Sequence, residues 1–376
     1  MKKLFAFSLV LWAVVSCCDK PRQGAPELYD AAAFDTVIDG RAVSLYTLKN
    51  EAGMTVQITN YGATIVDAWV PSRDGSFVNV VLGYPSIADY FVPENTFAGS
   101  VKGRYANRIA NGRFTLDGQE YTLAVNNGPN TLHGGLVGFS ERVWEARPFV
   151  GDKGEESVEL TYVSPDGEEN FPGTLTVKVV YSVRADNTLA IDYTAQCDAP
   201  TVLNLTNHAY FNLNDDHKKS VNSHEMTIHA DRYTPTDSTL IPTGELASVE
   251  GTALDFRQPA SIGSLVLGDD AAFDYRYGYD HNYVVRRAEP GVVPAAEVYE
   301  PSTGIVMSVS TDTPGIQFFT GKSRLQQDET SPYYRSAIAL EAQNFPDAPN
   351  HDDFPSSVLR PGETYRQTTL YGFSVR

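Results

Sequence analysis

Two neighbouring segments in which apolar residues occupy every second position constrain the fold more than any other feature of the sequence. In the first segment, these residues are Leu175, Val177, Val179, Tyr181 and Val183. The second segment repeats the pattern at Leu189, Ile191, Tyr193 and Ala195, after Asp186-Asn187. A period of two places the apolar side chains on one face of a strand. The two segments therefore predict an antiparallel hairpin that turns at Asp186-Asn187.

The rest of the chain also has a β pattern. A second hairpin is predicted at 114–125, where Asp117-Gly118 supplies a favoured two-residue turn. Further short strands are predicted at 54–58, 65–70, 159–163, 225–229, 283–286, 305–310 and 316–320. No segment sustains an apolar repeat of 3.6 residues, and the best short helix candidate is 86–91. The sequence therefore predicts an all-β protein, a single large antiparallel β-sandwich over residues 34–376.

The N-terminus is predicted to be a targeting segment rather than part of the fold. Lys2 and Lys3 precede an apolar run at 4–15, which has the length of a signal peptide and is too short for a permanent membrane span. The run ends in Val-Val-Ser-Cys, which resembles the bacterial lipoprotein box. We therefore expect residues 1–16 to be removed and Cys17 to carry lipid, with Cys18 as the competing position and ordinary secretion as the alternative.

On this interpretation, residues 17–33 are a tether, and the protein lies outside the cytoplasm, held to a membrane only through its lipid. Cys197 is the one cysteine beyond the N-terminal segment, so it has no partner for an internal disulfide. We expect it to be a buried, unreactive thiol.

Charge and missing motifs narrow the classes of function. The net charge is −18, from 47 acidic and 29 basic residues, which disfavours nucleic acid and anionic lipid as partners. No glycine-rich nucleotide motif is present, so no nucleotide cofactor is expected. His224-Glu225 begins like a zinc-protease motif, but the next histidine is His229, one position too far along, so no metal is expected. Any chemistry must then rest on side-chain acids and bases.

The segment 204–213, Asn-Leu-Thr-Asn-His-Ala-Tyr-Phe-Asn-Leu, is unusually polar for a β pattern. Buried polar groups are costly unless they are hydrogen-bonded. The segment therefore indicates either an internal hydrogen-bond network or one wall of a pocket that binds something polar. His208 is its only residue that titrates near neutral pH, so it is the candidate for proton transfer.

Four other stretches share this polar density. They are Gly-Arg-Tyr-Ala-Asn-Arg-Ile at 103–109, Asn-Thr-Leu-His-Gly-Gly at 130–135, Gly-Tyr-Asp-His-Asn-Tyr at 278–283 and Ile-Ala-Leu-Glu-Ala-Gln-Asn-Phe-Pro-Asp at 338–347. Each has a structural interpretation when taken alone. Arg108 can pair with a surface acid, Asp280 can fix a turn, and Glu341 can form a buried ion pair. Glu341 ends an apolar run, where a carboxylate is partly desolvated.

Taken together and in this order, the five stretches resemble the aldose 1-epimerase (galactose mutarotase) family. The motifs that match are Gly-Arg-x-x-Asn-Arg-Ile, Leu-His-Gly-Gly, Thr-Asn-His-x-Tyr-Phe-Asn-Leu, Asp-His-Asn and Leu-Glu-x-Gln-Asn. The similarity runs from about residue 54 to the C-terminus, including the turn at 359–363 and the strand at 365–375. The resemblance implies the galactose mutarotase-like supersandwich and the interconversion of α and β anomers of free aldohexoses such as glucose and galactose. It implies no cofactor.

The resemblance also implies roles for residues at matching positions. Glu341 is expected to remove the proton of the anomeric hydroxyl, and His208 to protonate the ring oxygen. His133 and Arg108 are expected to hold the ring-oxygen side of the sugar. The remaining substrate contacts are expected from Asn107, Tyr210, Asp280 and Gln317.

The residue types suit this chemistry without reference to the family. A ring oxygen is a poor leaving group unless it is protonated, and an acid and a base on either side of the acetal carbon each contribute roughly 10²–10⁴-fold. We expect Glu341 to start ionised and His208 to start protonated. Arginine, amide and carboxylate groups provide the directed hydrogen bonds that a polyol needs.

Three alternatives use the same residues. In a glycoside hydrolase, Asp280 and Glu341 would form the pair of catalytic carboxylates. An epimerase of hexose 6-phosphates would need additional cations for the phosphate and a cytoplasmic supply, and both the acidic chain and its export signal disfavour it. A non-catalytic sugar-binding lipoprotein would be expected to lack the acid or the base, and this chain keeps both.

Overall fold

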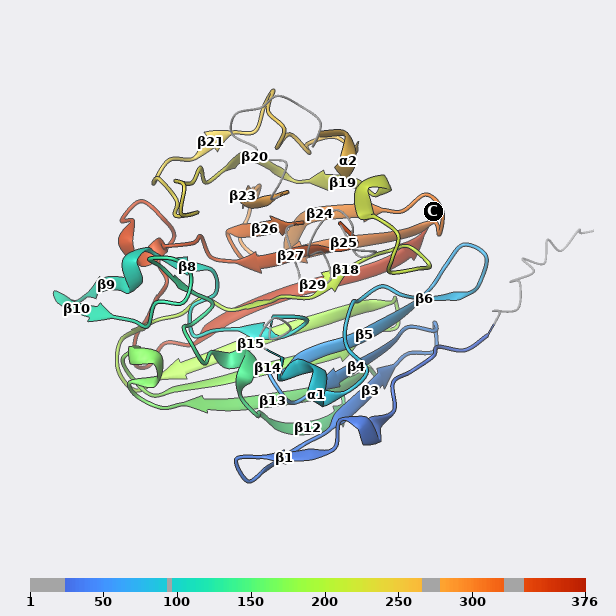
Figure 1. Ribbon diagram of the computed structural model, residues 1–376, viewed down its shortest axis with the longest axis horizontal. Coiled ribbons are helices and arrows are strands. Elements are labelled where there is room, and N and C mark those ends of the chain that lie inside the picture. The colour runs from blue at the N-terminus through green and yellow to red at the C-terminus, as the bar shows by residue number, and fades with distance from the viewer. Residues whose placement is uncertain (1–23, 93–96, 266–277, 321–334) are drawn as a thin grey trace, which may run out of the picture.

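The predicted sandwich is present in the computed structural model, which describes residues 24–92, 97–265, 278–320 and 335–376. Its largest sheet has nine strands and is antiparallel throughout (Figure 1). In spatial order they are β12 (Glu145–Val150), β13 (Glu156–Ser164), β14 (Leu175–Val183), β15 (Thr188–Cys197), β29 (Tyr365–Val375), β25 (Ile305–Thr311), β24 (Val293–Tyr299), β19 (Glu225–Ile228) and β22 (Ala260–Ser261). The last strand of the chain, β29, lies at the centre of this sheet.

Two smaller sheets carry the other long strands. The six-stranded sheet contains β18 (Tyr210–Phe211), β27 (Ile338–Gln343), β26 (Gly315–Phe319), β23 (Asp280–Val285), β20 (Ala230–Tyr233) and β21 (Ala247–Ser248). The four-stranded sheet contains β3 (Leu45–Lys49), β4 (Thr55–Thr59), β5 (Thr64–Pro71) and β6 (Phe77–Asn79). One apolar cluster joins all three sheets, with Val177 from β14, Ile58 from β4 and Leu340 from β27 among its members. The core therefore lies between the nine-stranded sheet and the two smaller ones.

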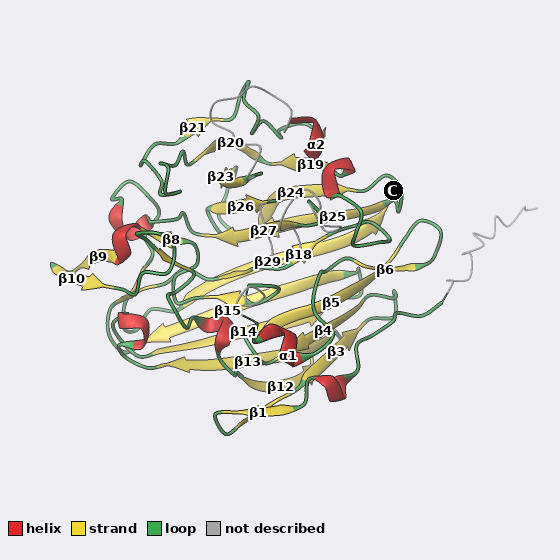
Figure 2. Ribbon diagram, in the orientation of Figure 1, coloured by secondary structure: helices red, strands yellow, loops and turns green. Residues whose placement is uncertain are grey.

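Short paired strands and helical turns make up the remaining regular structure (Figure 2). The strand pairs are β1 (Thr36–Ile38) with β2 (Arg41–Val43), β7 (Val101–Lys102) with β17 (Thr206–Asn207), β8 (Arg108–Ile109) with β11 (Thr131–Leu132), β9 (Arg113–Leu116) with β10 (Gln119–Thr122), and β16 (Thr201–Val202) with β28 (Val358–Leu359). The helices described are α1 (Ile87–Tyr90) and α2 (Ile262–Leu265), and among the 3₁₀ turns are η1 (Ala31–Ala33), η4 (Phe139–Glu141) and η6 (Val221–Ser223). Within the described residues, no helix combines the length and apolar character needed to cross a membrane.

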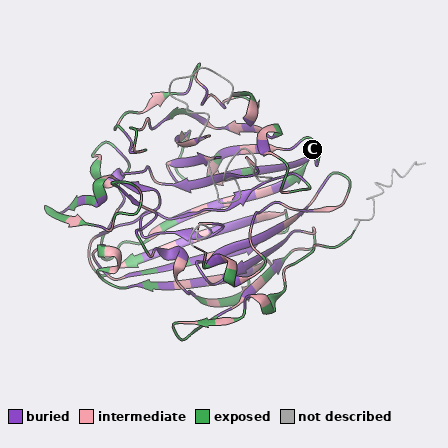
Figure 3. Cartoon of the chain, in the orientation of Figure 1, coloured by how far each residue is buried: buried purple, intermediate pink, exposed green. Residues whose placement is uncertain are grey.

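Both predicted hairpins form. β14 pairs with β15 in continuous register, and the alternating residues of β14 from Leu175 to Val183 are all buried (Figure 3). β9 pairs with β10 across Asp117-Gly118, although β10 ends at Thr122, before the predicted limit of 125. The predicted helix at 86–91 is found as α1, and β29 has the predicted bounds. These elements could be predicted because the alternation of apolar residues is local in the sequence. The alternation follows from the burial of one face of the sheet.

Two expectations about chain segments need adjustment. The folded region includes part of the segment expected as a tether, because Tyr29 exchanges backbone hydrogen bonds with the Gln57 side chain and Ala31–Ala33 forms η1. Cys197 is only half-buried rather than buried, and its sulfur lies 3.4 Å from the Leu359 carbonyl oxygen. The signal peptide, Cys17 and Cys18 lie outside the described residues.

Candidate active site

The centre of the site is a histidine and a glutamate brought together by two strands of the six-stranded sheet. Glu341 lies within β27, and β18 pairs with β27 through Tyr210 and Ala339. His208 comes two residues before β18, in the short gap that separates it from β17. The predicted polar segment is thus two short strands that pair with different partners, β7 and β27. His208 projects from the break between them, with its Nε2 3.5 Å from Glu341 Oε1.

This pair is buried but incompletely hydrogen-bonded. The side chains of His208 and Glu341 are 5% and 3% exposed. Among the described residues, neither His208 Nδ1 nor Glu341 Oε2 has a hydrogen-bond partner. A buried polar atom without a partner is costly, so such atoms in a native protein need an explanation. A bound polar molecule that supplies the missing hydrogen bonds is one.

His133 approaches the same point from the loop after β11. Its backbone has a φ of 52°, and a side-chain carbon at Gly134 would come within 2.0 Å of the Gly103 carbonyl oxygen, so only glycine fits there. His133 Nδ1 accepts a hydrogen bond of 3.1 Å from the backbone N–H of Asn107. In the neutral ring the proton must then be on Nε2. His133 is therefore oriented as a hydrogen-bond donor, with its ring centroid 5.3 Å from that of His208.

Zinc could in principle use such a set of residues. Donor atoms of His133, His208 and Glu341 lie within 4.8 Å of one another, and two histidines with one glutamate is a known zinc ligand set. A ligating histidine normally donates its other ring N–H to an acceptor. His133 does the opposite, since its Nδ1 accepts from Asn107. This orientation does not fit a metal ligand.

A second polar group adjoins the pair through the register of the sheet. Gln317 in β26 lies directly opposite Glu341 in β27. The Gln317 side-chain amide donates to Asp280 Oδ1 at 2.5 Å, and Arg108 Nη2 lies 3.3 Å from Asp280 Oδ2. Asp280, expected just before a strand, is the first residue of β23. Arg108, Asp280 and Gln317 therefore form one connected group beside Glu341.

Tyr210 and Asn107, both expected to contact substrate, occupy different positions. Tyr210 is part of an aromatic wall around His208, with ring centroids 4.9 Å apart. Phe97 and Phe319 complete that wall at 6.2 and 6.1 Å from His208. The Asn107 side chain is held by the protein, since its oxygen accepts from the Arg108 backbone N–H at 2.9 Å. The clearest role of Asn107 in this geometry is to orient His133 through its backbone.

The two arginines of the segment 103–109 have different environments. Arg108 faces Asp280, whereas Arg104 is turned away from the site. The Arg104 guanidinium donates to the carbonyl oxygens of Pro172 and Gly173 at 2.8 and 2.7 Å. Arg104 is therefore a structural residue, and only Arg108 of the two is placed to contact a ligand.

Burial dominates the electrostatics of the pair. Burial and the nearby Asp280 raise the pKa of Glu341 to about 8, although Lys102 and Arg108 oppose this shift. Burial, followed by Lys102, lowers the pKa of His208 to about 3. Burial thus favours a protonated Glu341 beside a neutral His208. This differs from the expected start with Glu341 ionised and His208 protonated, because burial penalises both charges.

Lys102 is the main feature that the sequence did not reveal. It lies in β7, is fully buried, and places its Nζ 2.7 Å from Ser100 Oγ and 4.4 Å from the Phe97 ring centroid. Burial lowers the pKa of Lys102 to about 7. Its position directly before the Gly-Arg motif gave a hint, but burial of a lysine is a property of the tertiary structure.

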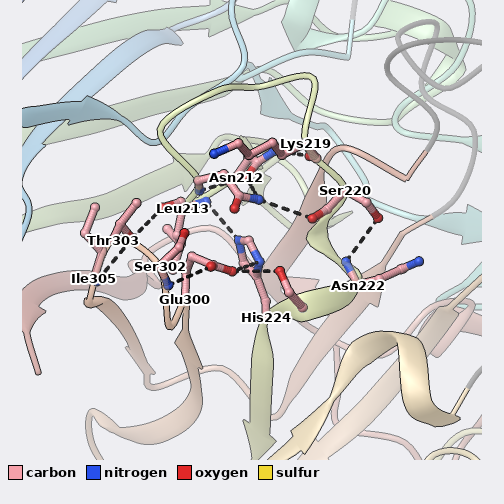
Figure 4. A network of polar contacts seen from close by, with 12 residues as sticks. Asn212, Leu213, Lys219, Ser220, Asn222, His224, Glu300, Ser302, Thr303 and Ile305 are labelled. Atoms are coloured by element: carbon pink, nitrogen blue, oxygen red, sulfur yellow. Dashed lines mark hydrogen bonds and ion pairs between the residues drawn. The ribbon is translucent and has the colours of Figure 1, made fainter.

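A second buried histidine–glutamate pair, His224 and Glu300, lies within a network of polar contacts (Figure 4). His224 Nδ1 is 2.9 Å from Glu300 Oε2, and His224 Nε2 accepts from the Leu213 backbone N–H at 2.9 Å. The Ser302 backbone N–H donates to the other oxygen of Glu300 at 2.9 Å. Both ring nitrogens of His224 therefore have protein partners, which explains His224-Glu225 without zinc.

Comparison with known proteins gives a consistent result. The profile of the aldose 1-epimerase family matches residues 44–372. The galactose mutarotase of Sus scrofa is 42% identical over 326 residues, which cover 86% of this chain and 92% of that protein. The aldose 1-epimerase of Escherichia coli (strain K12) is 39% identical over 340 residues, covering 89% and 96%. The crystal structure of galactose 1-epimerase from Lactobacillus acidophilus NCFM superposes with a TM-score of 0.78 at 30% identity, covering 90% of this chain and 97% of that one.

Proposed function

Because the chain belongs to the aldose 1-epimerase family, an isomerase family, we propose that Glu341 and His208 interconvert the α and β anomers of a free aldose by general acid–base catalysis. The enzyme is an aldose 1-epimerase, and its substrate is a small sugar. The observation that carries the assignment of residues is the buried 3.5 Å contact between His208 Nε2 and Glu341 Oε1. His208 Nδ1 and Glu341 Oε2 have no hydrogen-bond partner in the part of the chain that the structure describes.

The reaction needs one proton on the pair and one vacant basic site. Ionised Glu341 removes the proton from the anomeric hydroxyl while protonated His208 gives its proton to the ring oxygen. The bond between the ring oxygen and C1 breaks, which leaves an open-chain aldehyde. After rotation about the C1–C2 bond, the steps reverse on the other face of the carbonyl, and each group recovers its starting protonation. No atom or proton is gained or lost over the cycle.

The resting state and this starting state contain the same number of protons. Protonated Glu341 with neutral His208 differs from ionised Glu341 with protonated His208 only by moving one proton between them. Burial by itself favours the neutral form. Sugar hydroxyls that hydrogen-bond to the pair stabilise the charged form, because hydrogen bonds to an ionised group are the strong ones. Substrate binding would thereby place the proton on His208.

The neighbouring groups hold the ring for this exchange. His133 presents its Nε2–H as a neutral donor, since burial holds the pKa of His133 well below its ordinary range. Arg108, Asp280 and Gln317 offer donors and an acceptor for hydroxyls on the side of the pocket next to Glu341. Tyr210, Phe97 and Phe319 supply apolar faces for the C–H groups of a sugar.

A mutarotation assay tests the assignment. Freshly dissolved α-glucose and α-galactose are followed by polarimetry or NMR with wild type, Glu341→Gln and His208→Gln. Both variants are expected to lose most of the rate enhancement. Glu300→Gln serves as the matched control, because it alters a buried glutamate of the other pair. If Glu341→Gln retains near-full activity, Glu341 is not the base.

The hydrolase alternative is not favoured by the geometry. It requires Asp280 as the second catalytic carboxylate, and both oxygens of Asp280 are engaged by Arg108 and Gln317. New reducing ends from an oligosaccharide panel would count for hydrolysis. A protein that binds sugar in calorimetry without accelerating mutarotation would instead be the non-catalytic alternative.

We also propose that the mature protein is a lipoprotein outside the cytoplasm. The support is the sequence alone, with its basic start, apolar run at 4–15 and Cys17. Mass spectrometry of the membrane fraction is expected to find a lipidated Cys17 at the N-terminus, and Cys17→Ser is expected to release the protein from the membrane. If Cys18→Ser releases the protein from the membrane instead, Cys18 is the residue that carries the lipid.

A further inference from the structure

A buried aspartate at the end of the stretch 338–347 has no role in the proposed reaction. Asp347 follows β27, the strand of Glu341, and directly precedes the 3₁₀ turn η8 (Ala348–Asn350). Only 2% of Asp347 is exposed. Its φ is 56°, in the left-handed region that asparagine, aspartate and glycine adopt most readily. Because a buried carboxylate is costly unless it is hydrogen-bonded, its partners show what it holds in place.

Asp347 makes two hydrogen bonds to the chain around β8, the strand that carries Arg108. Its backbone N–H donates to the Arg108 carbonyl oxygen at 2.7 Å. The backbone N–H of Ala110, directly after β8, donates to Asp347 Oδ1 at 2.9 Å. These two bonds lie on either side of Ile109, so they fix the direction of β8 as well as its position.

The loop after β27 holds the Asp347 carboxylate in this orientation. The side-chain amide of Asn350 donates to Asp347 Oδ1 at 2.6 Å, and His351 Nε2 lies 3.3 Å from Oδ2. The Tyr105 hydroxyl, from the residues before β8, donates to the Phe345 carbonyl oxygen at 3.0 Å. The loop is therefore attached to the chain on both sides of β8.

The strand held in this way carries a residue of the pocket. Within β8, Arg108 pairs with Leu132 of β11. The side chain of Arg108 reaches the polar group beside Glu341, where its Nη2 lies 3.3 Å from Asp280 Oδ2. Asp347 is joined to β27 by the chain and to β8 by hydrogen bonds, so it links the positions of Arg108 and Glu341.

We propose that Asp347 is a positioning residue, which holds Arg108 at the distance from Glu341 that the bound sugar requires. The inference rests on the proposed function, because Arg108 and Glu341 are proposed there to contact the same sugar. Arg108 holds the sugar before and during the reaction, and the His208–Glu341 contact is made by residues outside β8. Loss of the Asp347 carboxylate is therefore expected to weaken substrate binding more than it slows the chemical step.

Two substitutions separate the carboxylate from the backbone. Asp347→Gly keeps a residue that adopts a positive φ, with its backbone N–H, and removes the acceptor of the Ala110 bond. It is expected to raise the KM of glucose about three- to tenfold, the effect of one lost hydrogen bond, and to leave kcat within about twofold of wild type. Asp347→Asn keeps a side-chain oxygen and is expected to restore a KM near that of wild type. An unchanged KM in Asp347→Gly, or a loss confined to kcat, would overturn the proposal.

A double-mutant cycle tests whether Asp347 acts through Arg108. Arg108→Ala is expected to raise the KM of glucose by itself, because it removes the contact with the sugar. Adding Asp347→Gly to Arg108→Ala is then expected to raise KM by less than about twofold more, since residues that act through one contact are not additive. If the two effects on KM multiply in full, Asp347 acts independently of Arg108 and the proposal is wrong.

Asp312 offers a matched control. It is also a partly buried aspartate whose Oδ1 accepts from a backbone N–H, that of Thr368 in β29, at 2.8 Å. No residue of β29 is assigned to the pocket. Asp312→Gly is expected to leave KM and kcat unchanged, whatever its effect in a thermal melt. A rise of KM as large as that in Asp347→Gly would contradict the proposal, because loosening of the fold in general would then explain both.

Binding and structure separate this proposal from the assigned reaction. Glucose is titrated calorimetrically into Glu341→Gln with and without Asp347→Gly, and a crystal structure of Asp347→Gly shows where Arg108 lies. Weaker binding, with Arg108 displaced from Asp280, supports the positioning role even if wild type does not accelerate mutarotation and the proposed function fails. If wild type accelerates mutarotation, but Arg108 stays in place and glucose binds equally well, the proposed function stands and the positioning role fails.

Discussion

This protein contains two buried histidine–glutamate pairs, which differ in the contacts that their outer polar atoms make. His224 and Glu300 lie 2.9 Å apart, and backbone N–H groups satisfy the other nitrogen of His224 and the other oxygen of Glu300 (Figure 4). His208 and Glu341 lie 3.5 Å apart, and their outer atoms lack partners in the described part of the chain. The first pair is complete without a ligand. Under the proposed function, the sugar hydroxyls supply the hydrogen bonds that the second pair lacks.

The electrostatics follow the hydrogen bonds. Burial opposes the charge of Glu300, but its bonds from His224 and the Ser302 backbone lower the pKa to about 2. No residue that the structure describes donates such a bond to Glu341, and burial raises its pKa to about 8. The comparison teaches that burial alone does not assign a role to a carboxylate. The number of fixed donors around it decides whether it stays ionised as a structural anion or exchanges a proton near neutral pH.

Glu341→Gln, which alters the His208–Glu341 pair, is expected to have the largest effect. Loss of the base is expected to reduce kcat/KM for mutarotation by about 10²–10⁴-fold. Thermal stability is expected to stay at or above that of wild type, because the substitution removes a buried carboxyl that lacks a partner on one oxygen. Polarimetry and a thermal melt measure the two effects. A large loss of stability would show that Glu341 is held as firmly as Glu300.

Glu300→Gln is the reciprocal change. Removing one charge from a buried ion pair is expected to lower the free energy of unfolding by about 3 kcal/mol. Activity per folded molecule is expected to remain that of wild type, since His224 and Glu300 do not touch the site. Chemical denaturation combined with a mutarotation assay at low temperature separates the two readouts. Unchanged stability would remove the distinction between the pairs.

The two pairs should also respond to opposite ends of the pH scale. The pKa of Glu300 is lowered when folded, so its contribution to stability is present above its ordinary pKa and is lost as the pH falls towards about 2. The catalytic pair keeps its one proton up to the raised pKa of Glu341, so the rate should fall as the pH rises above about 8. Mutarotation rates, corrected for the uncatalysed reaction, test the alkaline effect on activity. Thermal melts at acid pH test the effect on stability. An activity loss confined to acid pH would contradict this proton count.

Lys102→Met is expected to have the smallest effect, and it tests the electrostatics of the His208–Glu341 pair alone. The positive charge of Lys102 lowers the pKa of both Glu341 and His208. Its removal is expected to move the alkaline limb of the pH–rate profile upwards and to leave the stability contributed by the Glu300 pair unchanged. Lys178→Met, at an exposed lysine paired with Glu159, is the control. A profile that does not move would mean that Lys102 acts only through packing against Phe97.

The sandwich could be predicted because its evidence is local. Alternation at 175–183 and 189–195 records which side chains face the core, and the structure buries that face of β14. The five polar motifs, read together in order, were enough to indicate the family. The motifs contain His208, Glu341, His133, Arg108 and Asp280, and the resemblance adds Gln317 from outside them. In the structure, Gln317 lies opposite Glu341 and donates to Asp280.

What the sequence could not decide is the state of those residues. His208 and His224 both lie in polar stretches, and only their distant partners separate them. His224 Nε2 accepts from Leu213 and its Nδ1 lies 2.9 Å from Glu300, whereas His208 Nε2 lies 3.5 Å from Glu341. The same holds for Arg104 and Arg108, four residues apart and pointing to different surroundings. Local pattern determines which face of a strand is buried. Desolvation, unmet hydrogen bonds and a buried Lys102 arise only when strands far apart in the chain are packed together, and these set the protonation of the site.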